Sequence, residues 1–266
     1  MTMRKPLKGK VALVMGVASE ESIAWAIAQE LTHQGARVIL GYQFRFHSRI
    51  MQLAPTLPHL IAYERCDMLK DDEVKAFFAK IHVPIDIVVH AIAFAPARSF
   101  EHRVVQTKDE DFTTAMLTSA HSLAKLMNAS RKHMPHGGSV IALSYLGGVR
   151  VAANYKVMGV AKAALEAYVR ELAVDLGPKG IRVNAISAGP IRTLAASGIP
   201  DMERLLSYNR QVSPMRDNVT QGDVGHLAAF LASDGARMIT GQTIYVDGGY
   251  SIIGVPDTSS VPAGHH

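Results

Sequence analysis

The sequence predicts a single-domain α/β fold built on a doubly wound parallel sheet. Short apolar runs alternate along the chain with longer segments of helical periodicity, which is typical of parallel sheets covered by helices on both faces. The residues that follow the apolar runs include glycines and polar side chains suited to contact a ligand. In such a fold the ligand binds at the carboxyl ends of the strands.

The strands are expected at residues 10–16, 37–42, 60–66, 85–91, 139–145 and 180–186, with a final strand at 242–249. Between them the periodicity predicts helices at residues 22–34, 71–81, 115–131 and 154–176, and Tyr155 is expected to begin the last of these helices. Residues 197–212 are predicted to form a mobile helical segment, since Gly198 and Pro200 interrupt its pattern.

Six residues that suit ligand contact fall at or just after predicted strand ends. They are Gly16, Gln43, Asp67, Ile92, Tyr145 and Ile191. Because the carboxyl ends of parallel strands meet at one edge of the sheet, these residues are expected to line a common crevice.

The turn after the first strand, residues 16–23, resembles the phosphate-binding turn of Rossmann-type folds in its position only. It holds a single glycine and fails the G-x-G-x-x-G pattern. Backbone N–H groups at a helix N-terminus bind phosphate, and Ser22 is placed to cap this helix and add a hydroxyl. The alternative is that this turn only connects the strand to the helix and binds no ligand.

Tyr155 and Lys162 are the residues best suited to reduction chemistry. A phenol gives a hydrogen bond or a proton to an oxygen that gains negative charge, and a nearby ammonium holds ligand hydroxyls and favours that charge. By spacing alone, a half-buried core tyrosine and a solvated lysine are the favoured interpretation. Tyr145, at the end of the fifth predicted strand, lies near them in sequence.

Three stretches around these residues resemble the NADH-dependent enoyl-acyl-carrier-protein reductases of bacterial fatty-acid synthesis, a divergent branch of the short-chain dehydrogenase/reductases. The stretches are residues 144–147, 154–162 and 182–199, and the resemblance extends over residues 8–249. Its most specific mark is a lysine seven residues after Tyr155, whereas the superfamily usually has tyrosine-x3-lysine. No tyrosine of this chain has a lysine four residues on.

The resemblance implies the roles of the site residues. The catalytic residues would be Tyr155, which stabilises or protonates the thioester oxygen, Tyr145 beside the thioester, and Lys162, which holds the nicotinamide ribose. The cofactor would contact Gly16, Ser22, Ile23, Gln43, Asp67, Met68, Ile92, Lys162, Ile191, Thr193, Leu194 and Ala195. The substrate would contact Ala95, Tyr145, Tyr155, Met158 and Ile199, under a lid formed by the segment near residues 197–212. An acyl carrier protein would deliver the enoyl chain, and a homotetramer is expected.

Gln43 indicates the choice of cofactor. An acidic residue at this position usually holds the adenosine ribose and repels a 2′-phosphate, and Gln43 is neutral. Members of the family that use NADH also carry glutamine here, so NADH is the expected cofactor. Arg45 keeps NADPH possible as a secondary cofactor, although a solvated arginine is the favoured interpretation.

Ala93 departs from the family pattern, which has glycine at this position. In the family, diphenyl-ether inhibitors such as triclosan stack on the oxidised cofactor beside that glycine. A methyl group takes up space that glycine leaves open. We therefore expect reduced triclosan sensitivity.

Composition sets the broad class of the protein. The 266 residues and 48% hydrophobic content suit one domain, predicted at residues 1–254 with a flexible tail at 255–266. Cys66 is the only cysteine, so an intrachain disulfide is excluded. Neither a signal-peptide pattern nor a run of about 18 apolar residues is found, so a soluble, cytoplasmic protein without a membrane partner is expected.

The remaining function classes receive little support. A net charge of +5 without a basic motif gives no argument for a nucleic-acid partner. The twelve histidines show no ligand spacing, so no metal site is expected. Two rival functions stay open: a short-chain dehydrogenase acting on a carbonyl or alcohol, and a non-catalytic nucleotide-binding regulator. The tyrosine-x6-lysine spacing counts against the first of these rivals.

Overall fold

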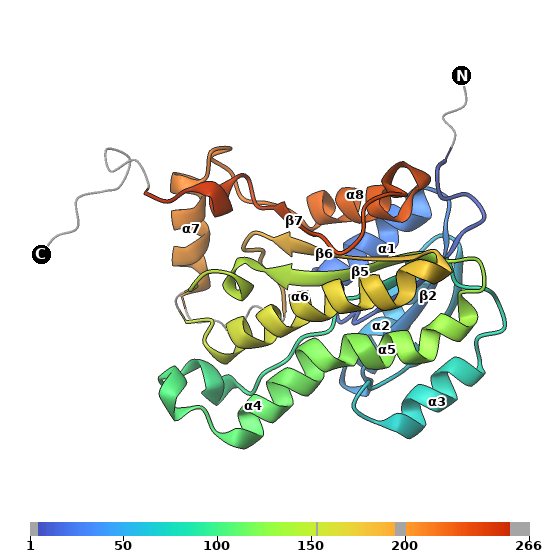
Figure 1. Cartoon of the computed structure of the whole chain (residues 1–266), viewed down its shortest axis with the longest axis horizontal. Helices are drawn as coiled ribbons and strands as arrows, with labels where there is room; N and C mark the ends of the chain where they lie inside the picture. Colours follow the sequence, from blue (N-terminus) through green and yellow to red (C-terminus); the bar gives the residue numbers. More distant parts are fainter. Residues whose placement is uncertain (1–4, 153, 195–200, 256–266) are drawn as a thin grey trace, which may run out of the picture.

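The computed structural model describes residues 5–152, 154–194 and 201–255, and within them forms a seven-stranded parallel sheet covered by helices on both faces (Figure 1). The strand order is β3-β2-β1-β4-β5-β6-β7. The order reverses between β1 and β4, which is the switch point where doubly wound sheets bind ligands. The predicted fold class is confirmed.

The seven strands lie where the apolar runs predicted them, with ends that differ by at most three residues. Their bounds are β1 Val11–Met15, β2 Arg37–Tyr42, β3 Leu60–Arg65, β4 Ile87–His90, β5 Gly138–Tyr145, β6 Ile181–Ala188 and β7 Thr243–Val246. β1 and β4 are completely buried, which explains their unbroken apolar sequences.

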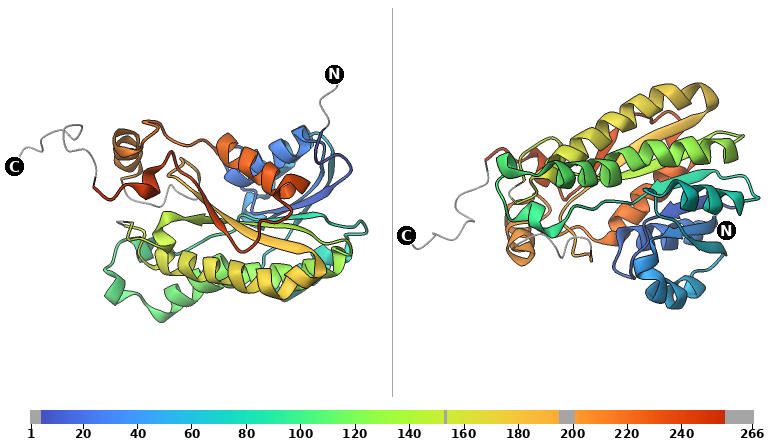
Figure 2. Two further views of the ribbon diagram at one scale, coloured as in Figure 1. Left: turned by 45° about the horizontal axis from the view of Figure 1, so that its top comes forward. Right: turned by 90° about the horizontal axis from the view of Figure 1, so that it is seen from below.

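Two helical layers enclose the sheet (Figure 2). One layer consists of α1 (Ile23–His33), α2 (His47–Leu53) and α8 (Gln221–Ala232), with Trp25 and Leu31 among its buried side chains. The other consists of α3 (Asp71–Ala79), α5 (Ser122–Ser130) and α6 (Val157–Leu176), with Phe77 in its core. α4 (Asp109–Met116) and α7 (Met202–Val212) flank the carboxyl ends of the strands.

Local sequence explains where several helices begin. Ser22 caps α1, its hydroxyl accepting a hydrogen bond from the Trp25 amide at 3.3 Å. Thr220 and Asp223 form a capping box at the start of α8. Three acidic residues in the first turn of α3 stabilise this helix, because their negative charges interact favourably with the positive end of its dipole.

The predicted helix at residues 115–131 is confirmed, but it begins earlier, at Asp109, and contains a π-helical turn. α4 ends at Met116, a π-helical turn occupies Leu117–His121, and α5 follows. The hydroxyl of Ser122, the first residue of α5, donates to the Thr118 carbonyl within this turn at 2.6 Å. The wider turn brings Thr118 and Ser119 to the cavity loops described below, and such π-turns are frequent at functional sites.

The predicted start of the helix at Tyr155 is also wrong, because α6 begins at Val157. Asn154 and Lys156 have positive φ angles of 65° and 47°, which no right-handed helix accepts. Tyr155 therefore belongs to an irregular turn that precedes α6, whereas Lys162 lies on α6 itself.

The C-terminal predictions fall partly outside the described residues. α7 confirms a helix within the predicted segment 197–212, whereas residues 197–200 are not described. The predicted tail, residues 255–266, lies outside them apart from Val255. Among the described residues no helix is long and apolar enough to cross a membrane.

Candidate active site

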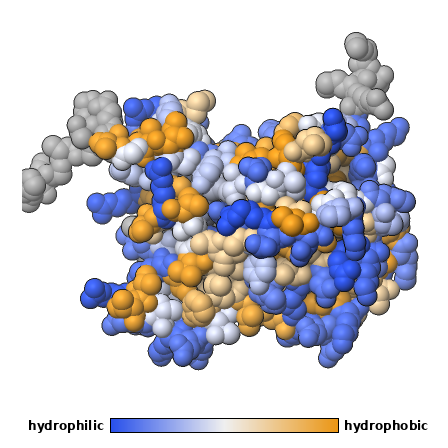
Figure 3. Space-filling view, viewed as in Figure 1, coloured by the Kyte–Doolittle hydropathy of each residue, from blue (hydrophilic) through white to orange (hydrophobic). Residues whose placement is uncertain are grey.

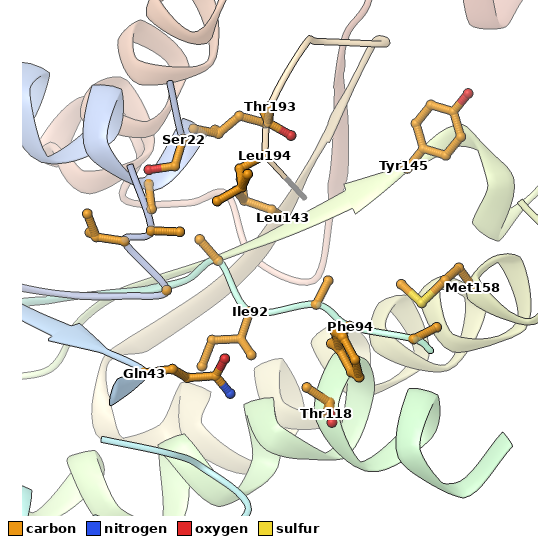
Figure 4. A pocket seen from close by; sticks show the side chains of 18 of the residues that line it. Ser22, Gln43, Ile92, Phe94, Thr118, Leu143, Tyr145, Met158, Thr193 and Leu194 are labelled. Atoms are coloured by element: carbon orange, nitrogen blue, oxygen red, sulfur yellow. The ribbon is translucent and has the colours of Figure 1, made fainter. Parts of the chain in front are cut away.

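A cavity of about 610 Å³ opens at the carboxyl ends of the strands. Its walls are the loops after β1 to β6, the start of α6 and the first turns of α7. Figure 4 shows Ser22 and Thr193 toward one end and Tyr145 and Met158 toward the other. The cavity is elongated and suits an extended ligand with chemically different ends.

The turn after β1 approaches the loop after β4 more closely than any side chain would allow. Gly16 has a φ of +100°, and a Cβ atom there would lie 2.2 Å from the Ala91 carbonyl oxygen. Glycine is therefore required at this single position, even though the longer glycine motif is absent. Ser22, Ile23 and Ala24 bring the N-terminus of α1 to the same end of the cavity, where its amide dipoles favour an anionic group.

Gln43 and Arg45 follow β2 and both line the cavity. Arg45 is exposed, as expected of a solvated arginine, but its guanidinium carbon also lies 4.7 Å from the Phe46 ring centroid and 5.1 Å from that of Phe94. These distances are typical of cation–π contacts. Arg45 is thus held beside the cavity wall.

Tyr145 and Tyr155 form an edge-to-face pair, with ring centroids 4.8 Å apart and planes at 67°. Gly147 makes room for this pair, since a Cβ atom there would lie 2.6 Å from the Tyr155 ring. Lys156 donates to the Phe100 carbonyl at 2.6 Å and so ties the irregular turn to the loop after β4. The strained backbone around Tyr155 places its phenol in the cavity rather than on a helix face.

Both phenols are protonated at neutral pH, and burial moves the pKa of each further above neutrality. It raises the pKa of Tyr145 to about 12, and burial together with the neighbouring Tyr145 raises the pKa of Tyr155 as well. A protonated phenol is a hydrogen-bond or proton donor, as the chemistry at a charged oxygen requires.

Lys162 is buried in the cavity wall, and its Nζ donates to the Leu143 carbonyl at 2.7 Å. Burial lowers the pKa of Lys162 to about 8, an effect that the nearby Glu166 carboxylate opposes. An ammonium carries three N–H donors, so the bond to Leu143 leaves capacity for ligand hydroxyls.

The far end of the cavity is apolar. Ala95 and Met158 belong to a small buried cluster with Ala115, Val157 and Ala161, against which Ala93 and Tyr155 pack. This floor suits a hydrocarbon chain better than a second polar group.

The structure brings together the predicted site residues that it describes. The cavity wall contains Gly16, Ser22, Ile23, Gln43, Asp67, Met68, Ile92, Ala95, Tyr145, Tyr155, Met158, Lys162, Ile191, Thr193 and Leu194. The two remaining predictions, Ala195 and Ile199, lie outside the described residues. In the described part of the chain, no group of three or more His, Cys, Asp or Glu side chains is arranged to hold a metal ion.

Sequence reasoning did not name several cavity residues, among them Phe94, Thr118, Met202 and Leu205, although the last two lie in the segment expected to form a lid. Phe94 follows a predicted strand end, so its position was a usable signal. Thr118 reaches the cavity through the π-helical turn, and Met202 and Leu205 do so through the placement of α7, neither of which has a local sequence signal. The Thr118 hydroxyl is buried without a hydrogen-bond partner in the described residues, which leaves it available to a ligand.

A doubly wound sheet with a tight glycine turn and a helix N-terminus at one end of the cavity, and a phenol and an ammonium toward the other, is typical of a dinucleotide-dependent oxidoreductase. The family model described as enoyl-(acyl carrier protein) reductase matches residues 16–251. This chain belongs to that family.

Individual relatives support the same assignment. The NADH-type enoyl-acyl-carrier-protein reductase of Nostoc is 46% identical over 94% of this chain and 99% of its own, and that of Escherichia coli is 44% identical over 92% and 95%. The Bacillus cereus enzyme, solved with NADP+ and an indole naphthyridinone, superposes with a TM-score of 0.91 at 45% identity, covering 94% of this chain and 99% of that chain. The Anaplasma phagocytophilum enzyme, solved with NAD, gives a TM-score of 0.90 at 43% identity over 94% and 97%.

Proposed function

We propose that this reductase transfers a hydride from NADH to the β-carbon of a trans-2-enoyl thioester. The observation that carries the proposal is the meeting of a protonated Tyr155 phenol and a buried Lys162 on one cavity with an apolar floor. Membership of the enoyl-(acyl carrier protein) reductase family supports the same reaction.

The residues along the cavity fit a nicotinamide dinucleotide. The close approach at Gly16 and the N-terminus of α1 suit the diphosphate, while Ser22, Ile23, Ile92, Ile191, Thr193 and Leu194 line the walls around it. Gln43 would hold the adenosine ribose, Asp67 and Met68 the adenine, and Lys162 the nicotinamide ribose. When bound, the nicotinamide supplies the hydride.

The chain's own residues then act on the thioester. As the β-carbon gains hydride, negative charge develops on the thioester oxygen, and the Tyr155 phenol donates a hydrogen bond or proton to it. The Lys162 ammonium favours the same charge, and Tyr145 packs beside the reacting group. Protonation of the α-carbon completes the saturated thioester and leaves NAD+.

The direct test mixes the protein with NADH and crotonyl thioester and follows the loss of NADH absorbance. Steady turnover is expected. Turnover only with a carbonyl or alcohol substrate would indicate the short-chain dehydrogenase, and NADH binding without any turnover would indicate the regulator.

The partner and the assembly belong to the same proposal. An acyl carrier protein is the proposed donor of the enoyl chain, which the net charge of +5 suits because such carriers are acidic.

We also propose a homotetramer, because Val105, Val174 and Ile252 are 84%, 75% and 75% exposed. Figure 3 shows apolar side chains in several separate places on the face that carries α4, α6 and the residues after β7. Light scattering tests the assembly. The free buried thiol of Cys66 supports a reducing, cytoplasmic location.

We expect NADH to be preferred over NADPH by roughly tenfold in kcat/KM. Gln43 offers hydrogen bonds to ribose hydroxyls, whereas an added phosphate loses hydration that must be replaced, at a cost of about 1–3 kcal/mol. Arg45 is the one cation that we find beside Gln43 on the described cavity wall. Replacing Arg45 by Gln should leave kcat/KM for NADH within about threefold of the wild-type value. A wild-type preference for NADPH that is lost in Arg45→Gln would show that Arg45 contacts the 2′-phosphate.

Ala93 supports the proposal of reduced triclosan sensitivity. The Ser119 hydroxyl accepts from the Phe94 amide at 2.9 Å and donates to the Phe94 carbonyl at 3.1 Å, directly beside Ala93. These two bonds restrain the loop, so it has little freedom to move away from a ring placed against the Ala93 methyl group. A clash of this size commonly costs about 1–3 kcal/mol.

Ala93→Gly is therefore expected to raise triclosan affinity by roughly ten- to hundredfold with little change in kcat/KM for the slimmer enoyl substrate. Inhibition constants measured at saturating NAD+ provide the test. Ala76→Gly, the same substitution at an exposed position of α3 that does not line the cavity, is the control. An unchanged constant in Ala93→Gly would mean that the alanine is a neutral substitution.

A further inference from the structure

Glu166 is a buried carboxylate with no role in the function proposed so far. It is 4% exposed and lies one helical turn after Lys162 on α6. Burying a carboxylate is costly unless other groups compensate its charge. Its Oε1 atom accepts a hydrogen bond from the Ser144 hydroxyl at 2.5 Å, a length typical of a hydroxyl bound to a carboxylate.

α6 holds the end of β5 at two consecutive residues. Lys162 donates to the Leu143 carbonyl at 2.7 Å, and Ser144, the next residue, donates to Glu166. The turn that follows packs onto the same place, since a Cβ atom at Gly148 would lie 3.0 Å from Glu166 Oε1. Tyr145 lies between these two anchored segments in the chain, so Glu166 acts on the position of its ring through Ser144 and the turn at Gly148.

The charge of Lys162 depends on what surrounds it. Glu166 on α6 and His90 on β4 interact with it electrostatically, and Tyr145 and Tyr155 line the same cavity. Burial and the charge of Lys162 lower the pKa of His90 to about 3, so this imidazole is neutral, and both phenols are neutral as well. Among the described groups, Glu166 is thus the anion that acts on Lys162.

We propose that Glu166 is a positioning residue whose charge keeps Lys162 in its ammonium form and whose bond to Ser144 fixes the strand end carrying Tyr145. The proposal rests on the proposed function of Lys162 in holding NADH. At neutral pH an ammonium donates to the ribose hydroxyls, whereas a neutral amine would do so more weakly.

Glu166→Gln isolates the charge, because the amide oxygen still accepts from Ser144. NADH dissociation constants are measured by fluorescence from pH 6 to 9.5. In the wild type, affinity is expected to fall above about pH 8, where Lys162 loses its proton. In Glu166→Gln this fall should move to lower pH by roughly one unit, with affinity at pH 6 within about threefold of wild type. Glu171→Gln, the same change at an exposed position of α6, should match the wild type. If NADH affinity falls at the same pH in Glu166→Gln as in the wild type, the proposal is overturned.

Thermal unfolding without cofactor gives a second, independent reading. Below about pH 8 the folded wild type contains the Lys162 ammonium next to Glu166, and the variant lacks that attraction. Above about pH 8 Lys162 is neutral in both folded proteins, so neither protein gains stability from a charge attraction to Lys162. The deficit in Tm of Glu166→Gln should therefore shrink between pH 7 and about pH 9. A deficit constant over this range would indicate a purely structural carboxylate and overturn the proposal.

Two further variants complete the test. Glu166→Asp keeps the charge, so its NADH affinity should fall at nearly the same pH as in the wild type. If the affinity of Glu166→Asp instead follows that of Glu166→Gln, the charge of Glu166 does not act on Lys162. Ser144→Ala keeps the charge of Glu166 but loses the hydrogen bond between the two residues. It should lower kcat severalfold without changing the pH at which NADH affinity falls. An unchanged kcat in Ser144→Ala would show that the bond to Glu166 does not fix the strand end that carries Tyr145. Absence of wild-type turnover with crotonyl thioester would instead refute the proposed function, while the cofactor-free unfolding would still decide the charge coupling.

Discussion

Tyr155→Phe is expected to lower kcat by about 10²- to 10³-fold with NADH affinity changed by less than about threefold. The phenol is positioned to donate to the thioester oxygen only as charge develops there, so its loss raises the barrier and leaves cofactor binding intact. The ring stays in place, because Phe retains the edge-to-face contact with Tyr145 and the packing against Gly147.

Steady-state kinetics with NADH and crotonyl thioester, paired with NADH titration by fluorescence, measure this effect. Tyr168→Phe is a suitable control, since Tyr168 lies on α6 and its hydroxyl pairs with His121 at 2.9 Å, away from the cavity wall. A Tyr155→Phe variant with kcat near the wild-type value would assign the donor role to another group, of which Tyr145 is the nearest.

Lys162→Met is expected to weaken NADH binding by roughly ten- to hundredfold. Hydrogen bonds from a charged group are worth about 1.5–3 kcal/mol, and the ammonium is positioned to supply them to the ribose hydroxyls. Met has a similar length and remains compatible with the buried site, but it leaves the Leu143 carbonyl without its donor. Some loss of thermal stability is therefore expected as well.

NADH titration separates this variant from Tyr155→Phe. Lys179→Met, at an exposed position after α6, controls for the change in net charge. If Tyr155→Phe and Lys162→Met weaken NADH binding equally, the division of roles between phenol and ammonium is wrong. Saturating NADH should restore a larger share of activity to Lys162→Met than to Tyr155→Phe.

The sequence by itself determined the sheet, because burial on both faces demands unbroken apolar strands and leaves a strong local pattern. It also determined the edge at which the site lies, since Gly16, Gln43, Asp67 and Tyr145 follow strand ends that parallel pairing brings together. Ser22 was identifiable as a helix cap for a local reason, the bond of its hydroxyl to an amide three residues on.

The tertiary structure alone decided how these side chains meet. Helical periodicity extends back to Asn154, yet the positive φ angles of Asn154 and Lys156 and the bond from Lys156 to Phe100 delay the start of the helix to Val157 and turn Tyr155 into the cavity. The pairing of Glu166 with Ser144 likewise joins residues 22 positions apart. A local pattern records which residues are buried, but the contacts that outweigh helical propensity or compensate a buried charge come from distant parts of the chain and form only when the sheet and its helices pack together.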